Sequence, residues 1–200
     1  MIDLFKDGFL VVDNFLPEEK CEYLRNFALN PPGNYHDHYK GYKAINFDNG
    51  NNEYSIKNLV YADIMPKLDF LEKIVYDRSW FFVYDNESSG VPAHADPSFI
   101  NLNLWVTSND CINDYTKNGL KIYHKIVGDK VSWEDYNKNQ NFIQEQIKNC
   151  ESTIIPYNYN RAVIFLGKLF HRTMGVSMKS GYNNRRISYT FLFNKQNGFS

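Results

Sequence analysis

The chain has 200 residues, enough for one domain with a single hydrophobic core. Its 22 basic and 23 acidic residues nearly cancel, which argues against nucleic acid and anionic lipid as partners without excluding a local basic groove. No apolar run approaches the roughly 18 residues of a membrane span, and the N-terminus lacks the long apolar core of a signal peptide. Three scattered cysteines fit reduced thiols better than a disulfide framework, so we expect a cytoplasmic protein without a membrane partner.

The N-terminal part of the chain predicts a strand followed by two helices. Residues 8–12 are apolar and read as a short strand. Pro17 fits the first position of a helix, and the acidic residues after it suit a first helical turn. A polar loop is expected over residues 33–54, and a second helix over residues 56–75, which Pro66 should end or kink. We expect both helices to back the outer face of a sheet.

From Trp80 onward the chain predicts short strands separated by turn-forming residues. Runs rich in β-branched and aromatic residues occupy residues 80–84, 99–106, 120–127, 161–166 and 186–193. One helix is expected between the third and fourth runs, from a Ser132 cap to about Lys148. No repeat or linker is visible, so we expect one domain over residues 1–200. Helices followed by many short strands favour a β-sandwich or barrel with helical cladding.

Three residues form a candidate metal site. His94 and Asp96 make an H-x-D triplet near a strand end, and residues i and i+2 of a strand project to the same side. Alone this signal is weak, because a surface histidine beside a turn aspartate is the more common reason for such a triplet. His171 lies in an apolar strand-like run, where a histidine is usually a hydrogen-bonded core residue. Together, however, two histidines and one carboxylate would form a facial triad that leaves open positions on iron(II).

A second candidate feature is the pair Arg186 and Ser188, which share one face of the last predicted strand. Ile187 and Tyr189 share the other face, which can pack on the helices, so the polar pair should point into the barrel. An unpaired arginine is costly to bury, and a bound dicarboxylate would supply the missing counter-ion in bidentate geometry. The alternative is that Arg186 and its neighbour Arg185 are solvated charges at a strand edge.

The strand that follows the triplet carries asparagines at alternating positions. Asn101 and Asn103 alternate with Leu102 and Leu104. Asparagine is poor in strands unless its amide has a partner, so we expect both asparagines to face the cavity. His124 is expected to be a core or edge residue and not a metal ligand.

Taken together, the H-x-D triplet, His171 and the Arg-x-Ser pair resemble the 2-oxoglutarate- and iron(II)-dependent oxygenases. The opening DGFLVVDNFLPEEKCEYLR, residues 7–25, is similar to the N-terminal strand and helix of the prolyl-4-hydroxylase-like branch of that superfamily. The resemblance covers nearly the whole chain. It implies a double-stranded β-helix, or jelly roll, with its core at about residues 80–194, two N-terminal helices and one inserted helix.

The resemblance also implies roles for individual residues. Iron(II) would be bound by His94, Asp96 and His171. The far carboxylate of 2-oxoglutarate would pair with Arg186 and Ser188, with further contacts from Tyr84 and Asn103. Such an enzyme uses O₂ to couple oxidative decarboxylation of 2-oxoglutarate to hydroxylation of a C–H bond, and ascorbate could stimulate it. The separation of 77 positions between the two histidines is wide for this family, which the inserted helix explains, and the spacing of Tyr84 also departs from the family pattern.

The substrate is less well defined by the sequence. The branch-level likeness favours a peptidyl or free amino-acid side chain, or a small metabolite, and the oligomeric state is not readable. Three cations are interpreted as lying near the mouth of the site, where they could meet an acidic substrate: Arg161, Lys168 and Arg172. Two alternatives stay open, namely a cupin-like enzyme with another metal on the same ligands and a catalytically silent jelly-roll binding module. The cupin-like enzyme would not need the Arg-x-Ser pair. Retention of the three ligands together with that pair argues against the silent binding module.

Overall fold

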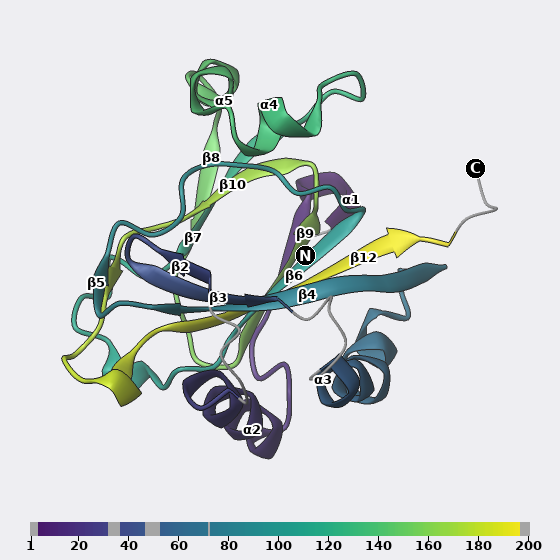
Figure 1. Cartoon of the computed structure of the whole chain (residues 1–200). Helices are drawn as coiled ribbons and strands as arrows, with labels where there is room; N and C mark the ends of the chain where they lie inside the picture. Colours follow the sequence, from purple (N-terminus) through teal and green to yellow (C-terminus); the bar gives the residue numbers. More distant parts are fainter. Residues whose placement is uncertain (1–3, 32–36, 47–52, 72, 197–200) are drawn as a thin grey trace.

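The computed structural model describes residues 4–31, 37–46, 53–71 and 73–196. Two curved antiparallel sheets face each other, and helices cover the outside of the larger one (Figure 1). The larger sheet contains, in spatial order, β1 (Phe9–Val12), β9 (Arg161–Leu166), β6 (Ile100–Trp105), β12 (Ile187–Lys195), β4 (Ile74–Tyr84), β3 (Tyr42–Asn46) and β2 (Asp37–Tyr39). The smaller sheet contains β10 (Leu169–Thr173), β7 (Leu120–Ile126) and β8 (Ser152–Ile155), and β5 (Glu87–Ser88) pairs with β11 (Val176–Ser177).

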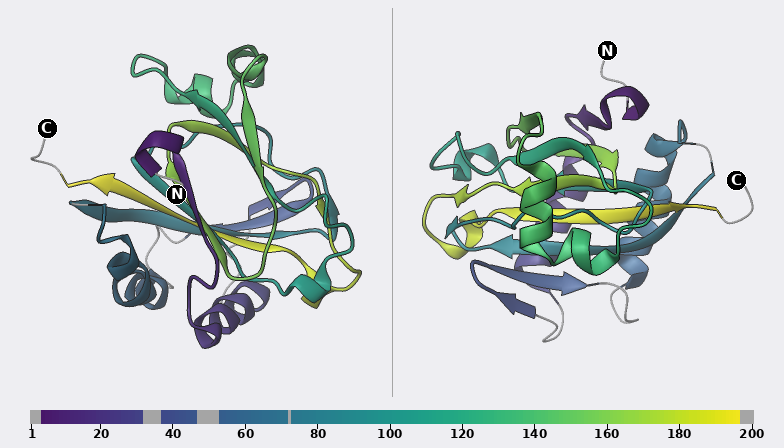
Figure 2. Two further views of the ribbon diagram at one scale, coloured as in Figure 1. Left: turned by 180° about the vertical axis from the view of Figure 1, so that it is seen from behind. Right: turned by 90° about the horizontal axis from the view of Figure 1, so that it is seen from above.

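The helices form two groups on opposite sides of the molecule (Figure 2). The first group contains α2 (Glu18–Leu29), α3 (Glu53–Leu59), the π-helical turn η1 (Val60–Ile64) and the 3₁₀ turn η2 (Met65–Leu68). The second group, near the smaller sheet, contains α4 (Trp133–Asn137) and α5 (Gln140–Ile147). Short pieces complete the structure: α1 (Leu4–Asp7), η3 (Asn109–Cys111) and η4 (Tyr182–Asn184). Within the described ranges, no helix is long and apolar enough to cross a bilayer.

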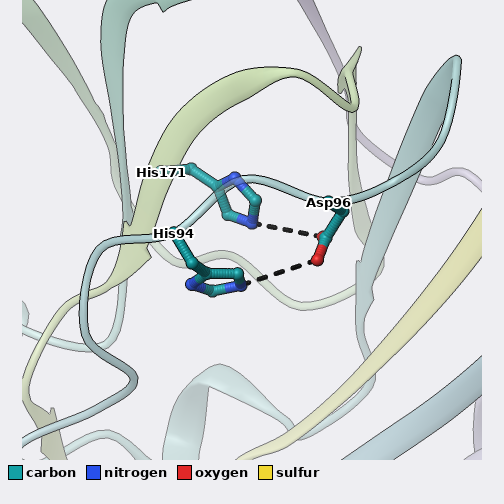
Figure 3. A group of neighbouring side chains, drawn as sticks. All are labelled: His94, Asp96 and His171. Atoms are coloured by element: carbon teal, nitrogen blue, oxygen red, sulfur yellow. Dashed lines mark ion pairs between the residues drawn. The ribbon is translucent and has the colours of Figure 1, made fainter. Parts of the chain in front are cut away.

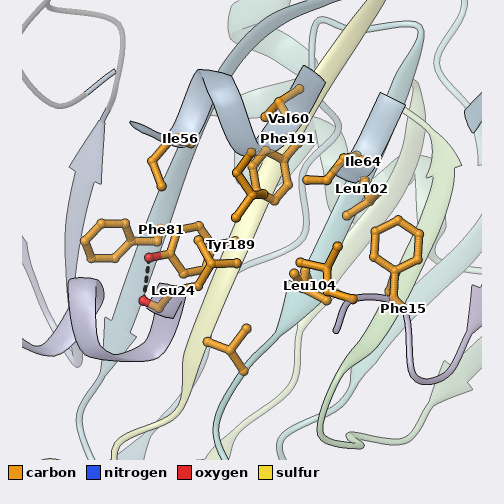
Figure 4. Packing of buried hydrophobic residues seen from close by; sticks show 14 of the residues in the cluster. Phe15, Leu24, Ile56, Val60, Ile64, Phe81, Leu102, Leu104, Tyr189 and Phe191 are labelled. Atoms are coloured by element: carbon orange, nitrogen blue, oxygen red, sulfur yellow. Dashed lines mark hydrogen bonds between the residues drawn. The ribbon is translucent and has the colours of Figure 1, made fainter. Parts of the chain in front are cut away.

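The main core lies between the larger sheet and the first group of helices (Figure 4). Tyr189 and Phe191 of β12 are fully buried there, as the alternation of this strand predicts. The hydroxyl of Tyr189 donates a hydrogen bond of 2.7 Å to the carbonyl of Leu24 in α2, so this buried polar atom is paired. Each large apolar side chain buried in this layer contributes about 1.5–3 kcal/mol to folding. The packing fixes β12 with its other face toward the smaller sheet.

The predicted jelly-roll class is confirmed, and several predicted boundaries are wrong. Residues 33–54 were expected to be a loop, but they contain β2 and β3, which extend the larger sheet through pairing of β3 with β4. The helix expected over residues 56–75 ends at Leu68, because Pro66 sits in a 3₁₀ turn, and β4 begins already at Ile74.

The single inserted helix is two helices. Ser132 caps α4 as expected, accepting a hydrogen bond from the backbone N–H of Asp135. The chain then leaves helical hydrogen bonding after Asn137, and the side chain of Asn139 caps α5 by accepting from the N–H of Phe142. The side chain of Asn139 offers the backbone an acceptor other than a helical carbonyl. One helix therefore ends before this residue and a second helix begins after it.

Candidate metal centre

His94 and His171 lie side by side because a short backbone pairing joins the loop of residues 90–97 to β10. The N–H of His94 donates to the carbonyl of His171 at 2.9 Å, and the N–H of His171 donates back at 2.8 Å. The ring centroids are 4.4 Å apart. Gly90, with φ of 78°, starts this loop where the carbonyls of Thr173 and Met174 leave no space for a Cβ atom. Tertiary pairing thus brings together two residues that are far apart in sequence.

Asp96 completes the cluster and faces both imidazoles (Figure 3). Its N–H donates to the carbonyl of Gly167 at 2.9 Å, which anchors the loop to the turn before β10. Oδ1 lies 3.9 Å from Nε2 of His94, and Oδ2 lies 3.6 Å from Nε2 of His171. The three side chains each offer a ligand atom within 4.8 Å of the others. Donors at about 2.1 Å from one common ion lie about 3–4 Å apart, so the cluster has the dimensions of a metal site.

The tautomers of both histidines suit metal binding. Nδ1 of His94 lies 2.8 Å from the carbonyl of Pro92, and Nδ1 of His171 lies 3.0 Å from the carbonyl of Leu169. A carbonyl only accepts, so Nδ1 must carry the proton in each ring. The lone pair is then on Nε2, the atom that faces Asp96, and backbone acceptors of this kind orient metal-binding histidines in known sites.

Burial lowers the pKa of His171 to about 4, and the neighbouring His94 adds to this effect while Asp96 opposes it. The side chain is therefore neutral at physiological pH, which is the form that binds a metal.

Asp96 is oriented by a buried amide. Asn101 is fully buried on β6, and its Nδ2 donates to Oδ2 of Asp96 at 2.6 Å. The hydroxyl of Ser98 donates in turn to the amide oxygen of Asn101. These two hydrogen bonds leave Oδ1 of Asp96 without a described hydrogen-bond donor. Asn101 was expected to face the cavity, but it is not among the residues that line it; instead it contacts the metal cluster, which the sequence did not reveal.

A narrow cavity of about 50 Å³ runs inward from the three clustered residues, between the two sheets. Tyr84, Asn103 and Ser188, which sequence analysis linked to the co-substrate, all line it, together with Thr173 and Thr190. The hydroxyl of Thr190 donates to the amide oxygen of Asn103 at 3.0 Å, and the hydroxyls of Tyr84 and Thr173 are 3.3 Å apart. The cavity wall is thus mostly uncharged and hydrogen-bonding.

Arg186 is not among the residues that line this cavity; it lies behind Tyr84, a residue of the cavity wall, and is only 1% exposed. Its Cζ is 4.7 Å from the ring centroid of Tyr84, 5.5 Å from that of Trp105 and 5.6 Å from that of Tyr157. Among the described residues, Nε and Nη1 of Arg186 have no hydrogen-bond partner and no carboxylate pairs with them. Cation–π contacts compensate only part of the cost of burying a guanidinium. The neighbouring Arg185 behaves differently, because it pairs with Asp85 near the surface at 3.2 Å.

A wider groove of about 450 Å³ opens on the other side of the cluster. The groove and the narrow cavity share His94, Asp96, Trp80, Phe82 and Val91, so they meet at the candidate metal site. One wall continues the inward face of the larger sheet, since alternate residues of β3 pair with the inward residues of β4. The opposite wall comes from α4 and α5 and contributes Trp133, Asn137 and Gln140.

The two inserted helices also hold the loop that carries the H-x-D triplet. Nδ2 of Asn137 donates to the carbonyl of Ala95 at 2.9 Å, and Nε2 of Gln140 donates to the carbonyl of Ala93 at 3.0 Å. The N–H of Ala95 donates to the carbonyl of Tyr136 at 3.0 Å. Sequence analysis predicted helical structure here without assigning it a place in the site.

The three cations expected near the mouth do not line the groove. Arg161 forms a bidentate pair with Asp13, at 2.6 and 2.8 Å, at the far end of β9. Nζ of Lys168 lies 3.7 Å from the ring centroid of Tyr136. Neither residue is in the described lining of the groove, nor is Arg172, and the cation found there is Arg78. His124 is exposed and bonds Thr153 on the smaller sheet, away from the cluster, as expected for a residue that is not a ligand.

Comparisons with known proteins place the fold. No protein-family model matches the chain, and no curated protein matches it. Solved structures do match. The non-heme alpha ketoglutarate dependent epimerase SnoN from nogalamycin biosynthesis aligns with 96% of this chain and 80% of its own, with a TM-score of 0.72 and 10% identity. A 2OG-Fe(II) oxygenase family oxidoreductase from Burkholderia pseudomallei aligns with 98% of this chain and 88% of its own (TM-score 0.66, 10% identity).

A Pseudomonas putida prolyl-4-hydroxylase aligns with 98% of this chain and 96% of its own, with a TM-score of 0.57 and 16% identity. The chain therefore has the fold of the 2-oxoglutarate- and iron(II)-dependent oxygenases, and at these identities the likeness concerns the fold alone.

Proposed function

We propose that the chain is a non-haem iron(II) oxygenase that uses O₂ to couple decarboxylation of 2-oxoglutarate to hydroxylation of a C–H bond. The substrate would be an amino-acid side chain or a small metabolite. The observation that carries this proposal is the burial of Arg186, without a described counter-ion, behind a narrow cavity that starts at a His-Asp-His cluster.

The donor set fits iron(II). Two imidazoles and one carboxylate on one side of an ion leave other coordination positions open, and nitrogen and oxygen donors of this type suit non-haem iron. His94, Asp96 and His171 would hold the ion, with both imidazoles already in the required tautomer. The ion would supply activation of O₂ and of the bound keto acid, chemistry that no amino-acid side chain provides.

The polarity of the cavity wall suits 2-oxoglutarate, because hydroxyl and amide groups line it. The keto-acid end of the molecule would lie at the cluster, and its far carboxylate would pair with Arg186 and accept from Ser188, which is 4% exposed on the same strand face. Tyr84 and Asn103 would flank the chain of the diacid. Such binding would remove the cost of the unpaired guanidinium, and the apolar layer around it would keep water away.

The alternatives explain less of the site. An enzyme with another metal on the same three ligands could use the cluster, but it has no need for a buried cation behind it. A silent binding module needs neither the fixed tautomers nor the hydrogen bond from Asn101 to Asp96.

The direct test is succinate formation by the purified protein with iron(II), ascorbate and 2-oxoglutarate, which does not require the substrate because these reactions run uncoupled at a low rate. We expect succinate that depends on iron(II) and is lost in His171→Ala. The surface variant His124→Ala is the matched control and should retain activity. The proposal is contradicted if the wild-type protein forms no succinate and also shows no iron(II)-dependent binding of 2-oxoglutarate.

A further inference from the structure

The outer groove carries five aromatic side chains from separate parts of the chain. Tyr39 and Tyr42 come from β2 and β3, Trp80 and Phe82 from β4, and Trp133 from the start of α4. Two of these rings reach solvent: Tyr39 is 54% exposed and Trp133 is 42% exposed. Large aromatic side chains that gather in a groove and remain exposed indicate a binding surface.

Each exposed ring is supported on one side by the protein. Tyr39 stacks on Tyr42 with ring centroids 4.9 Å apart and an interplanar angle of 13°. Tyr42 in turn lies 4.8 Å from Phe82. On the helical wall, Nζ of Lys138 lies 4.2 Å from the ring centroid of Trp133. Stacking on Tyr42 holds the ring of Tyr39, so its exposed face is available for a ligand at little entropic cost.

The groove offers almost no net charge to a ligand. Its described lining contains Arg78, whose Nε lies 3.2 Å from Oδ2 of the adjacent Asp77, so its charge is already compensated at the rim. The other ionised group, Asp96, belongs to the candidate metal cluster. A strongly charged substrate would therefore lose hydration on entering the groove, where Arg78 already has a partner and Lys138 lies outside the described lining.

Polar recognition in the groove comes from neutral groups. Nε1 of Trp80 is buried and has no described hydrogen-bond partner, although the residue lines both the groove and the narrow cavity. It is a donor that an oxygen atom of a ligand would satisfy. Asn137 and Gln140 use their amide nitrogens on the H-x-D loop, and each keeps a carbonyl oxygen that can accept from a ligand hydroxyl.

We infer that the substrate is an uncharged, ring-bearing small molecule with oxygen substituents, and that its ring packs against Tyr39 and Trp133. This inference rests on the proposed function, because it places the ring beside the open side of the metal cluster. A groove of about 450 Å³ is within the range of small-molecule sites and has room for more than one ring. Trp133 and Tyr39 are then specificity-determining residues.

A peptide substrate would bind the same region differently. An extended peptide needs partners for its own N–H and C=O groups, and the edge strand β2 (Asp37–Tyr39) is the element that could supply them. The aromatic walls do not provide such partners, and the ring faces match a cyclic ligand better. Peptide binding is therefore the competing outcome of the test.

The experiment titrates three uncharged probes into the protein by calorimetry, with the protein loaded anaerobically with iron(II) and 2-oxoglutarate. The probes are 2-naphthol, an acyclic diol with the same number of non-hydrogen atoms, and an octapeptide with blocked termini. We expect 2-naphthol to bind at least about tenfold more tightly than the other two, and Trp133→Ala to lose about tenfold of that affinity. Tyr115→Ala is the matched control, because Tyr115 is 69% exposed and outside the groove lining.

Each outcome decides one of the two proposals. The inference of a ring-bearing substrate is overturned if the peptide or the diol binds as tightly as 2-naphthol or more tightly. It is also overturned if 2-naphthol does not bind, or if its affinity is unchanged in Trp133→Ala. Binding of 2-oxoglutarate is measured first in the same samples, and its absence would overturn the proposed function instead. Retained 2-oxoglutarate affinity in Trp133→Ala shows that this variant is folded.

Discussion

The narrow cavity and the outer groove meet at the same three residues, yet they are built differently. The cavity lies between central strands, with Ser188 and Thr190 of β12 and Asn103 of β6 in its wall, and Arg186 directly precedes β12. The groove is walled by a peripheral hairpin, β2–β3, and by inserted helices, α4–α5. Central strands are held by neighbours on both sides, whereas peripheral segments tolerate sequence change. On the proposed function, the central strands would carry the reaction chemistry and the peripheral segments would carry substrate choice.

The largest expected effect is in the narrow cavity. Arg186→Met should weaken binding of 2-oxoglutarate by about 100-fold or more, because the variant loses a charge-assisted pair in a buried site. The free energy of unfolding of the ligand-free protein should stay equal or rise, since an uncompensated guanidinium is replaced by an apolar side chain. Calorimetry and urea denaturation measure the two quantities. Arg185→Met, which removes the surface pair with Asp85, should leave 2-oxoglutarate binding intact.

The guanidinium has a structural role instead if Arg186→Met loses as much stability as a core truncation and still binds 2-oxoglutarate with unchanged affinity.

The second prediction concerns pH and the buried imidazole. The pKa of His171 is lowered from 6.5 to about 4, so below pH 6.5 the unfolded chain binds a proton that the folded protein does not. Stability of the metal-free protein should therefore fall as the pH decreases from 6.5 toward 4, by up to about 3 kcal/mol from this residue. Urea denaturation in the presence of a chelator, compared between wild type and His171→Gln, isolates the contribution. Equal slopes for the two proteins would show that His171 does not titrate in this way.

The sequence predicted the cavity better than the groove. Strand alternation placed Ser188 on the inward face, and Ser188 lines the cavity. The limits of β9 were predicted as residues 161–166 because Arg161 is followed by a continuous apolar run. The hairpin β2–β3 was taken as a loop, since its polar composition hides a pairing that only β4 makes possible.

The features of the site that the sequence did not predict depend on tertiary contacts. Convergence of His94 with His171 depends on two backbone hydrogen bonds between distant segments. The hydrogen bond from Asn101 to Asp96 has no sequence signal beyond an asparagine in a strand, and sequence analysis did not single out Trp133, which lines the groove.

A smaller effect is expected from the amide that orients Asp96. Asn101→Ala should weaken iron(II) binding by about 10- to 100-fold, because residues that position metal ligands commonly contribute this much. Metal affinity is measured by anaerobic competition with a chelator. Ser98→Ala, one step further from the carboxylate, should have a weaker effect in the same direction. If Ser98→Ala is the more damaging of the two, the direction of this hydrogen-bond chain is wrong.

The smallest effect should come from the helical wall. Asn137→Ala removes one hydrogen bond to the carbonyl of Ala95 and should cost about 1 kcal/mol locally. Hydrogen exchange should become faster in residues 93–96, while the affinity for 2-oxoglutarate changes by less than about threefold. If Asn137→Ala loses as much 2-oxoglutarate affinity as Arg186→Met, the cavity and the groove do not have separate roles.

A crystal structure of the protein grown anaerobically with iron(II) and 2-oxoglutarate, with anomalous scattering recorded at the iron edge, would show both ligands at once. We expect one anomalous peak bound by His94, Asp96 and His171, and a diacid whose far carboxylate lies against the guanidinium of Arg186 and the hydroxyl of Ser188. An iron peak elsewhere, or a diacid bound away from Arg186, would contradict this expectation.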